Sequence, residues 1–491
     1  MTAGQRPDKQ VEIRYSLSDL DSTVCTIAVY ASSDAGATWT LPITAVTGAV
    51  GPGIPPGSGK LILWDSKVDL PGVVGSQFRV RVCAHDGDDY PPEITNPTVT
   101  GKINQGQPGT VQFSCTSKAL GGSVQSVVVN LTAIGGVAAQ PLARGSGDQW
   151  QGSAQVVAPA AGLKTVTFTA TTSGGASSSA PATIEVAPAG MVLIPAGQYQ
   201  MGDPFTIEGD VNERPRHAVY VDRFFMDRYE VTNQQYADAL NWARAQGGLI
   251  TVTSGVVYKQ GSGTAYPYSN TTISNTGSQI TWNGSQFGVN TGKQNHPVVS
   301  VSWHGAAAYA NWRSAMHGRP LNYDLSNWTC NWGTGYRLPT EAEWERAARG
   351  GVEGHRFPWS DVDTIDFGRA NYYSAASPFY DLVTTQGYHP DFDGGGYPYT
   401  SPVGQFAPNG FGLFGMAGNA WEWCNDFYDA LYYVTSPSQN PRGPLVGTNR
   451  VLRGGSWGSV ALNLRCAYRS NGVPTYRGML NGFRLVASSA D

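Results

Sequence analysis

The chain is poor in charge: only 14% of its 491 residues are Asp, Glu, Lys or Arg. No cluster of Lys and Arg stands out and the formal net charge is −4, so we expect no nucleic-acid partner. The sequence contains no apolar run long enough for a membrane-spanning helix, so we expect no transmembrane segment. Residues 1–15 lack the apolar centre of a signal peptide, so we do not expect a leader within this sequence.

Cysteine and histidine are few, and they form no recognisable metal motif. The six cysteines include no CxxC pair, which argues against structural zinc. The seven histidines show no HxH or HxxxH spacing, so we expect structural roles for them. Cys25 and Cys83 fall in two strand-like stretches, which leaves open a disulfide across a small sandwich or two buried free thiols.

Glycine, proline and tryptophan are plentiful, with 61, 31 and 14 residues. This composition favours turn-rich β architecture, and the length predicts two to four domains. Short strand signals separated by turns predict a β-sandwich over residues 1–88, which resembles an immunoglobulin-like module. A second β unit of this kind is predicted over 91–187, where residues 165–169 alternate between polar and apolar. Neither unit carries a catalytic constellation, so we interpret both as spacers.

A third region, residues 190–491, is richer in Trp, Tyr, Asn and Arg. Thr232 and Thr340 each begin a capping box, which predicts a helix after each of them. The apolar spacing of residues 303–316 predicts another helix. Residues 248–295 are rich in Gly, Ser, Thr and Asn, and we expect an excursion of hairpins there.

Seven motifs follow one another in this third region. They are MVLIPAGQYQMG (191–202), YEVTN (229–233), HPVVSVSW (296–303), YRLPTEAEWE (336–345), NGFGLFGMAGNAWEW (409–423), RGGSW (453–457) and NGFR (481–484). In this order they resemble the family of formylglycine-generating enzymes and sulfatase-modifying factors. The expected fold class is therefore multidomain: two all-β immunoglobulin-like sandwiches followed by an α+β formylglycine-generating-enzyme-type domain with a C-type-lectin-like fold.

The catalytic cysteines of that family are missing from this chain. The resemblance implies two cysteines soon after the RGGSW motif, whose thiolates bind copper and activate oxygen. Here the stretch from Trp457 to Leu464 contains no cysteine. Cys466 matches a structural cysteine of the family, but its usual partner position is Ala348. We therefore expect no copper and no catalytic residues, and the sequence favours a binding protein over an enzyme.

The same resemblance implies a first structural calcium site with oxygen ligands, which suit a hard cation. Its ligands would be the carboxylate of Glu422 and the carbonyls of Gly418 and Ala420. Glu422 lies between two tryptophans, and a carboxylate buried there needs either an arginine or a metal as its partner. Gly415 replaces a further Asn ligand of the family.

A second calcium site is implied farther upstream. It would use Asn371, the carbonyl of Tyr372, and the stretch from Gly395 to Tyr397. Gly395 stands where the family has an Asp, although Asp391 and Asp393 lie close in sequence and can substitute. A metal-free turn capped by Asn remains the alternative at this place.

The tail from Arg453 to Arg484 alternates between framework positions and positions of no consistent chemistry. We predict that the second group forms a ligand-binding surface: Trp457, Gly458, Ser459, Val460, Tyr468, Ser470, Asn471, Gly472, Val473, Tyr476, Gly478, Met479, Leu480 and Asn481. Aromatic residues with Ser, Gly and Asn between them give large contacts at low entropy cost. The layout is similar to variable proteins of diversity-generating retroelements, in which the C-terminal ligand-binding surface is hypermutated. Met479 departs from that pattern, and ordinary loop drift is the alternative.

These observations predict a secreted or cell-surface, non-catalytic recognition protein whose ligand is a protein or a glycan. The competing class is a metal-dependent oxidase or modifying enzyme of the same family with an altered active site. A structural surface protein that assembles through its β units is a third possibility.

Overall fold

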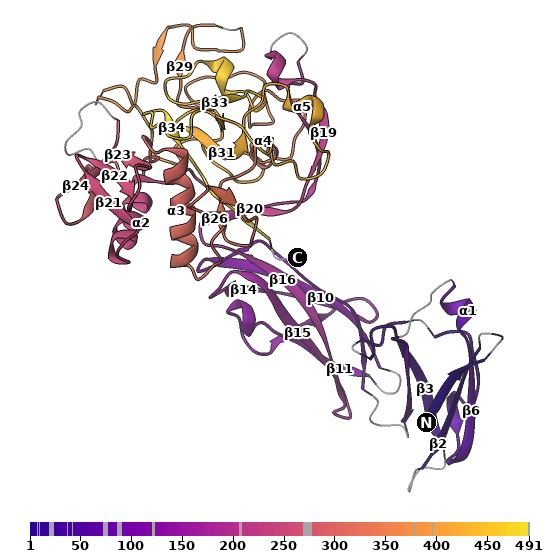
Figure 1. Cartoon of the computed structure of the whole chain (residues 1–491). Coiled ribbons are helices and arrows are strands. Elements are labelled where there is room, and N and C mark those ends of the chain that lie inside the picture. Colours follow the sequence, from indigo (N-terminus) through magenta and orange to yellow (C-terminus); the bar gives the residue numbers. More distant parts are fainter. Residues whose placement is uncertain are drawn as a thin grey trace. The chain divides into compact units, whose positions relative to one another are not determined.

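The computed structural model describes residues 1–489 except 7, 9, 19–23, 37, 42, 72–76, 86–90, 120–122, 206–208, 269–276, 378 and 395. It divides into two compact units, Met1–Val186 and Ala187–Asp491 (Figure 1). The predicted boundary between the first two β parts falls on residues 86–90, which lie outside the described residues.

The first part of the N-terminal unit contains two small antiparallel sheets, in the strand orders β1-β2-β6-β4 and β5-β3-β7. Their elements are β1 (Thr2–Gln5), β2 (Gln10–Leu17), β3 (Cys25–Ser32), β4 (Val46–Gly48), β5 (Gly51–Ile54), β6 (Gly57–Asp65), a short helix α1 (Ser66–Asp69) and β7 (Arg79–His85). β3 pairs directly with β7, and Ala28 is the residue opposite Cys83. Cys25 and Cys83 therefore lie in one sheet, and both are free thiols, so the structure has no disulfide across a sandwich at this place.

The second part, from Glu93 onward, has a four-stranded sheet in the order β13-β14-β10-β8 and a five-stranded sheet in the order β12-β11-β15-β16-β9. The strands are β8 (Glu93–Thr100), β9 (Ile103–Asn104), β10 (Pro108–Lys118), β11 (Val124–Asn130), β12 (Gln140–Pro141), β13 (Ala143–Arg144), β14 (Gln149–Val157), β15 (Gly162–Thr172) and β16 (Ser177–Ala187), with a 3₁₀ turn η1 (Thr132–Ile134). The alternation predicted around residue 167 is confirmed, because Val166, Phe168 and Ala170 of β15 are buried.

The C-terminal unit contains two four-stranded sheets, in the orders β17-β20-β35-β28 and β33-β32-β31-β34. The first uses β17 (Met191–Ile194), β20 (Phe224–Asp227), β28 (Tyr336–Arg337) and β35 (Val486–Ser488). The last strand of the unit, β35, pairs with β20 from its first part and with β28 from its middle. The second uses β31 (Trp421–Phe427), β32 (Arg450–Arg453), β33 (Ser470–Gly472) and β34 (Asn481–Gly482). This second sheet contains the tail strands β33 and β34.

The remaining strands of this unit form small sheets. They are β18 (Gly197–Met201) with β19 (His217–Val221), β21 (Ile250–Thr253) with β22 (Val256–Lys259) and β23 (Ala265–Tyr268), β24 (Ile280–Trp282) with β25 (Phe287–Val289), β26 (Tyr323–Asp324) with β27 (Thr329–Cys330), and β29 (Tyr373–Ser374) with β30 (Gly387–Tyr388). The hairpins predicted over 248–295 are confirmed for the described residues of that stretch.

The three predicted helices are present as α2 (Asn233–Ala245), α3 (Trp303–Met316) and α4 (Glu341–Ala348). Thr232 and Thr340 each form the predicted capping box, which satisfies backbone N–H groups of the first helical turn. A one-turn helix α5 (Tyr432–Thr435) and the 3₁₀ turns η2 (Val211–Glu213) and η3 (Ala461–Leu464) complete the unit. In the described part of the chain, no helix is both long enough and apolar enough to span a membrane.

Candidate functional site

Four framework arginines of the tail are buried in the interior of the C-terminal unit, none more than 2% exposed. Each one meets a carboxylate that lies outside the tail. The pairs are Arg453 with Glu345 of α4, Arg465 with Glu213 of η2, Arg469 with Glu341 of α4, and Arg484 with Glu422 of β31. The tail is therefore attached to the domain at four places.

The contacts are those of charge-assisted hydrogen bonds. Arg465 donates to the two oxygens of Glu213 at 2.9 and 2.8 Å, and Arg469 donates to those of Glu341 at 2.7 and 2.9 Å. Such two-pronged pairs fix the orientation of the guanidinium as well as its position. A buried carboxylate that loses its arginine is left as an uncompensated charge, which is strongly destabilising.

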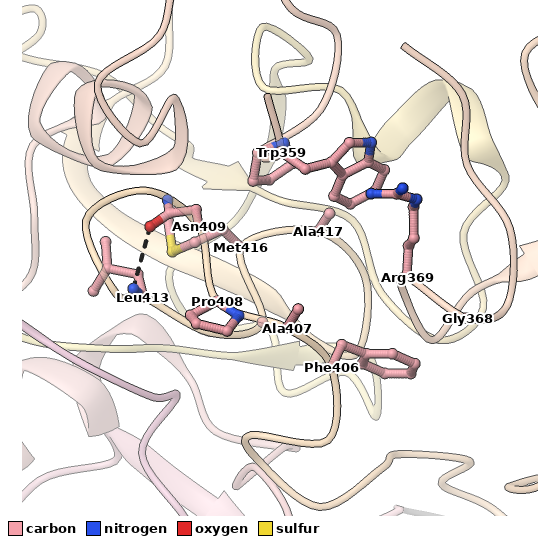
Figure 2. Close-up of a pocket in the computed structure, with 12 residues that line it drawn as sticks. Trp359, Gly368, Arg369, Phe406, Ala407, Pro408, Asn409, Leu413, Met416 and Ala417 are labelled. Atoms are coloured by element: carbon pink, nitrogen blue, oxygen red, sulfur yellow. Dashed lines mark hydrogen bonds between the residues drawn. The ribbon is translucent and has the colours of Figure 1, made fainter. Parts of the chain in front are cut away.

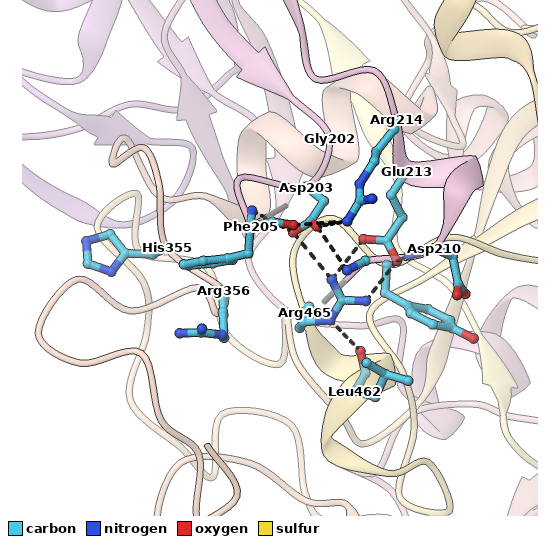
Figure 3. Close-up of polar contacts among 12 residues, drawn as sticks. Gly202, Asp203, Phe205, Asp210, Glu213, Arg214, His355, Arg356, Leu462 and Arg465 are labelled. Carbon is cyan, nitrogen blue, oxygen red and sulfur yellow. Dashed lines mark hydrogen bonds and ion pairs between the residues drawn. The ribbon is translucent and has the colours of Figure 1, made fainter. Parts of the chain in front are cut away.

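Arg465 also approaches a second carboxylate (Figure 3). Its Nη1 lies 3.7 Å from Oδ1 of Asp203, whose Oδ2 lies 3.3 Å from Arg214. Asp203 accepts the backbone N–H groups of Phe205 and Gly209, so it also closes the loop that follows β18. Burial raises the pKa of Glu213, and the hydrogen bonds from Arg465 oppose that rise.

The predicted ligand-binding residues differ in exposure. Asn471, Val473 and Tyr476 are exposed. Seven others are half-buried: Gly458, Val460, Tyr468, Ser470, Gly472, Met479 and Leu480. The remaining four are buried, which corrects the expectation that the whole set lies at the surface: Trp457, Ser459, Gly478 and Asn481.

Specific contacts explain the burial of these residues. The indole N–H of Trp457 donates to the carbonyl of Met479 at 3.2 Å, and the hydroxyl of Ser459 lies 2.9 Å from that of Ser456. The carbonyl of Gly478 accepts the N–H of Ser300. These residues hold the tail together rather than facing solvent.

The tail segments meet around Trp421. The centroid of its ring lies 6.0 Å from that of Tyr468, and its backbone N–H donates to the carbonyl of Leu480 at 2.8 Å. β33, which carries Ser470, Asn471 and Gly472, is at one edge of the sheet and β34 is at the other. Of the half-buried positions, Ser470 and Gly472 lie in this sheet, and Tyr468 and Leu480 contact its strand β31 at Trp421.

A group of aromatic residues covers Trp457 and was not anticipated as a unit from the sequence. We call it the tyrosine–tryptophan cluster: Tyr373, Tyr388, Tyr397, Tyr399 and Trp457. Tyr373 and Tyr388 are opposite one another in the β29–β30 hairpin, with ring centroids 4.8 Å apart. The centroid of Trp457 lies 5.7, 5.5 and 5.3 Å from those of Tyr388, Tyr397 and Tyr399.

The cluster is joined to the tail by backbone contacts. The N–H of Tyr373 donates to the carbonyl of Ser459 at 3.0 Å. The sequence signal for it is the density of tyrosines on both sides of the loop near residue 393. Of its members, Trp457 belongs to the predicted ligand-binding set and Tyr397 to the Gly395–Tyr397 stretch of the second predicted calcium set. Spacing along the chain does not reveal that these rings meet a tryptophan about 60 residues later.

Glu422 has an arginine as its partner. Arg484 donates to Oε1 at 2.7 Å through Nη2 and to Oε2 at 2.8 Å through Nε, and the indole N–H of Trp344 donates to Oε2 at 2.7 Å. Both oxygens of this fully buried carboxylate are therefore engaged. Glu422, Gly418 and Ala420 do not fit a calcium ion, since the cation would have to compete with the guanidinium for the same oxygens.

The structure explains why a glycine stands at position 415, where the family has an Asn ligand. A Cβ at this position would lie 2.5 Å from Oε2 of Glu230, so no side chain fits there. Glu230 is buried, and among the described residues its Oε2 has no hydrogen-bond partner. Burial raises the pKa of Glu230 to about 7, against the attraction of Arg484, and the charge of Glu422 adds to the rise.

The second predicted calcium set is only partly described, because Gly395 lies outside the described residues. Asn371 and Tyr372 are buried, whereas Tyr397 is exposed. The side-chain amide of Asn371 donates to the carbonyl of Tyr399 at 2.8 Å, two residues after Tyr397. Calcium at this place stays a prediction.

A small recess of about 70 Å³ lies on the other side of the Gly415–Ala417 segment (Figure 2). Trp359 and Arg369 form one wall, with the guanidinium 5.3 Å from the centre of the indole, and Phe406 lies on another side. Arg369 is itself paired with Asp361 at 2.6 Å. The recess is lined mainly by apolar atoms that belong to the packing of this loop, and no titratable pair faces it for chemistry.

Candidate metal ligands do not converge in the described part of the chain: no three His, Cys, Asp or Glu side chains gather there as a possible metal site. Cys424 and Cys466 are buried, and burial raises the pKa of the Cys466 thiol to about 12. His296 and His304 are each packed in the interior or against an aromatic ring, and burial lowers the pKa of each to about 4.

These features define a class of protein: an α+β domain that carries the formylglycine-type motifs, is held together by buried arginine–carboxylate pairs, and has no cysteine between Trp457 and Leu464. A family model described as the sulfatase-modifying factor enzyme 1-like domain matches residues 177–489. The chain belongs to this family.

Known relatives agree with the assignment. The chain is 35% identical over 321 residues to a formylglycine-generating enzyme of Streptomyces coelicolor, covering 62% of this chain and 90% of that protein. It is 28% identical over 316 residues to the inactive C-alpha-formylglycine-generating enzyme 2 of Bos taurus, covering 61% and 88%. Among solved structures, Treponema denticola variable protein 1 is similar with a TM-score of 0.42 and 23% identity, covering 66% of this chain and 99% of that one.

Proposed function

We propose that this protein is a non-catalytic recognition protein that binds a protein or glycan ligand through its C-terminal tail. The observation that carries the proposal is that the tail combines buried framework residues with exposed apolar and aromatic residues. Arg453, Arg465, Arg469 and Arg484 are buried against carboxylates. Between them, Val473 and Tyr476 are 49% and 55% exposed. A fixed framework with exposed apolar and aromatic positions suits binding.

The chemistry of the tail also supports binding over oxidation. The copper enzymes of the family need two thiolates after the RGGSW motif, and this chain has none from Trp457 to Leu464. Cys466 is too deeply buried to act as a ligand for an exchangeable metal or substrate. The alternative function, a metal-dependent oxidase with an altered active site, is tested below together with binding.

The test is a binding screen of the full chain against a glycan array and a panel of intact cells. The variant Val473→Ser with Tyr476→Ser is compared with the control Leu445→Ser with Val446→Ser, an apolar pair that is even more exposed in the same unit. We expect the tail variant to lose at least tenfold in affinity and the control to retain it. Equal binding by both variants, or oxygen consumption by copper-treated protein with a cysteine-containing peptide, would overturn the proposal.

Four finer statements belong to the proposal. The N-terminal β parts act as immunoglobulin-like spacers, and the protein is secreted or displayed on a cell surface. The mixed positions of the tail are diversified by a retroelement; a genomic template repeat that differs from the tail codons at adenines supports this, and its absence defeats it. Calcium binds near Asn371, Tyr372 and Tyr397; this requires a melting temperature that rises with calcium but not with magnesium.

A further inference from the structure

Tyr397 packs against two rings of the cluster and is still exposed. Its ring centroid lies 4.7 Å from Tyr399 and 5.5 Å from Trp457, and those two rings are 5.3 Å from each other. Two rings stacked on opposite faces of a third would be about 9 Å apart or more, because each stacking distance is at least about 4.5 Å. Tyr399 and Trp457 therefore do not stack on opposite faces of Tyr397, so one face is left uncovered by these two rings, and Tyr397 as a residue is 53% exposed.

Four half-buried tryptophans elsewhere in this unit each have a cationic side chain over the ring. Arg244 lies over Trp282 at 5.2 Å, Lys259 over Trp328 at 5.8 Å, Arg442 over Trp332 at 4.1 Å, and Arg369 over Trp359 at 5.3 Å. Such contacts satisfy the negative face of the aromatic ring. Within the described residues, no Arg or Lys lies over any ring of the tyrosine–tryptophan cluster.

Two acidic residues lie close to Tyr397 in the sequence. Asp391 and Asp393 are both exposed and lie in the loop between Tyr388 and Tyr397. The raised pKa of Tyr388 comes from burial and from neighbouring tyrosines, without a basic group among its causes. Two exposed carboxylates in the loop that leads to Tyr397 disfavour an anionic ligand there and favour a cationic one.

We propose that the free face of Tyr397 binds a cationic side chain, arginine above all, from a protein partner. The guanidinium stacks on the ring as Arg442 does on Trp332 within the same chain, while Asp391 and Asp393 attract its charge. The cluster contains Trp457 of the tail and contacts the tail at Ser459, and the assignment rests on the recognition function proposed above. The partner is thereby a protein with an exposed basic residue rather than a neutral glycan.

The test uses the full chain and a short fluorescent peptide with two arginines. A matched peptide has citrulline, the neutral analogue of arginine, in their place. We expect the arginine peptide to bind at least three times more tightly than the citrulline peptide, and Tyr397→Ala to remove this difference. Tyr397→Phe keeps the ring and should keep the preference, and Asp391→Asn with Asp393→Asn should weaken it at low salt.

Phe379→Ala is the matched control, because Phe379 is 76% exposed but already has Arg356 over its ring at 5.4 Å. This variant should bind the arginine peptide as the unaltered chain does. Equal affinity for the two peptides would overturn the proposal, as would unchanged binding by Tyr397→Ala or preferential binding of maltotetraose at the cluster. In each case, loss of target binding in the Val473 and Tyr476 variant would still support the tail as a recognition surface.

Discussion

Arg465 and Glu213 form a two-pronged ion pair although 252 positions separate them in the sequence. Their side chains are 1% and 0% exposed. The pair joins the tail to the segment that follows β18, close to the start of the C-terminal unit (Figure 3). Its energetic role can be separated from any role in binding, because neither side chain reaches the surface.

Replacement of Arg465 by Met should destabilise the C-terminal unit by about 3–5 kcal/mol, since Glu213 would be left buried without its partner. Urea unfolding followed by tryptophan fluorescence measures this change. The control is Arg369→Met, which removes a pair with Asp361 whose side chains are 30% and 60% exposed, and which should lose less than about 1 kcal/mol. Equal losses in the two variants would mean that the buried pair is not a stabilising attachment.

The acidity of Glu230 should make stability depend on pH. Its pKa is about 7 in the folded chain, mainly through burial, against an ordinary value of 4.5. The folded state thus binds the proton more tightly, so stability is fully present below pH 4.5 and falls as the pH rises towards 7. Glu230→Gln should flatten this slope and gain about 3 kcal/mol relative to the unaltered chain at pH 8.

Unfolding curves between pH 4.5 and 8 test this prediction. Asp238→Asn, on the exposed side of α2, is the control and should leave the slope unchanged. A slope that persists in Glu230→Gln would assign the pH dependence to another group.

Trp457 should act on stability rather than as a contact residue. Its ring is 3% exposed beneath three tyrosines, so Trp457→Ala should lower the free energy of unfolding by about 3–5 kcal/mol. Tyr476→Ala, at an exposed position of the same tail, should change it by less than about 0.5 kcal/mol. Thermal denaturation of the two variants distinguishes these expectations, and a small effect of Trp457→Ala would contradict its placement in the core.

The buried thiols should be inert in the native protein. Burial raises the pKa of Cys466 to about 12 and that of Cys424 well above its usual value, so the reactive thiolate is scarce at neutral pH. Iodoacetamide labelling with mass spectrometry should modify these two residues only after denaturation. Labelling of either at the native rate of the half-buried Cys83 would show that it is accessible.

The sequence alone predicts local structure well in this chain. Capping residues such as Thr232 and Thr340 act within one helical turn, so they mark helix starts without knowledge of the fold. The limits of α3, Trp303–Met316, also follow from the local apolar pattern. Family membership follows from the seven motifs of the C-terminal region, which occur in the order typical of the family.

The arrangement of the candidate site depends on tertiary contacts and is not predictable in this way. Glu422 needs a partner once it is buried, but only the fold shows that Arg484 supplies it instead of a cation. Likewise, Trp457 belongs to a mixed stretch of sequence, and its burial depends on tyrosines about 60 residues upstream. Local sequence patterns show neither the partner of Glu422 nor the rings that cover Trp457.

The position of β35 between β20 and β28 has a consequence for biosynthesis. β20 cannot obtain its second neighbour until residues 486–488 have left the ribosome, so the domain finishes folding only after nearly all of it has been translated. Until then the edge of β20 is open, and open strand edges are templates for pairing with other chains. A nascent chain that stalls within the tail is therefore expected to be a target for chaperones, whatever residues occupy the mixed positions.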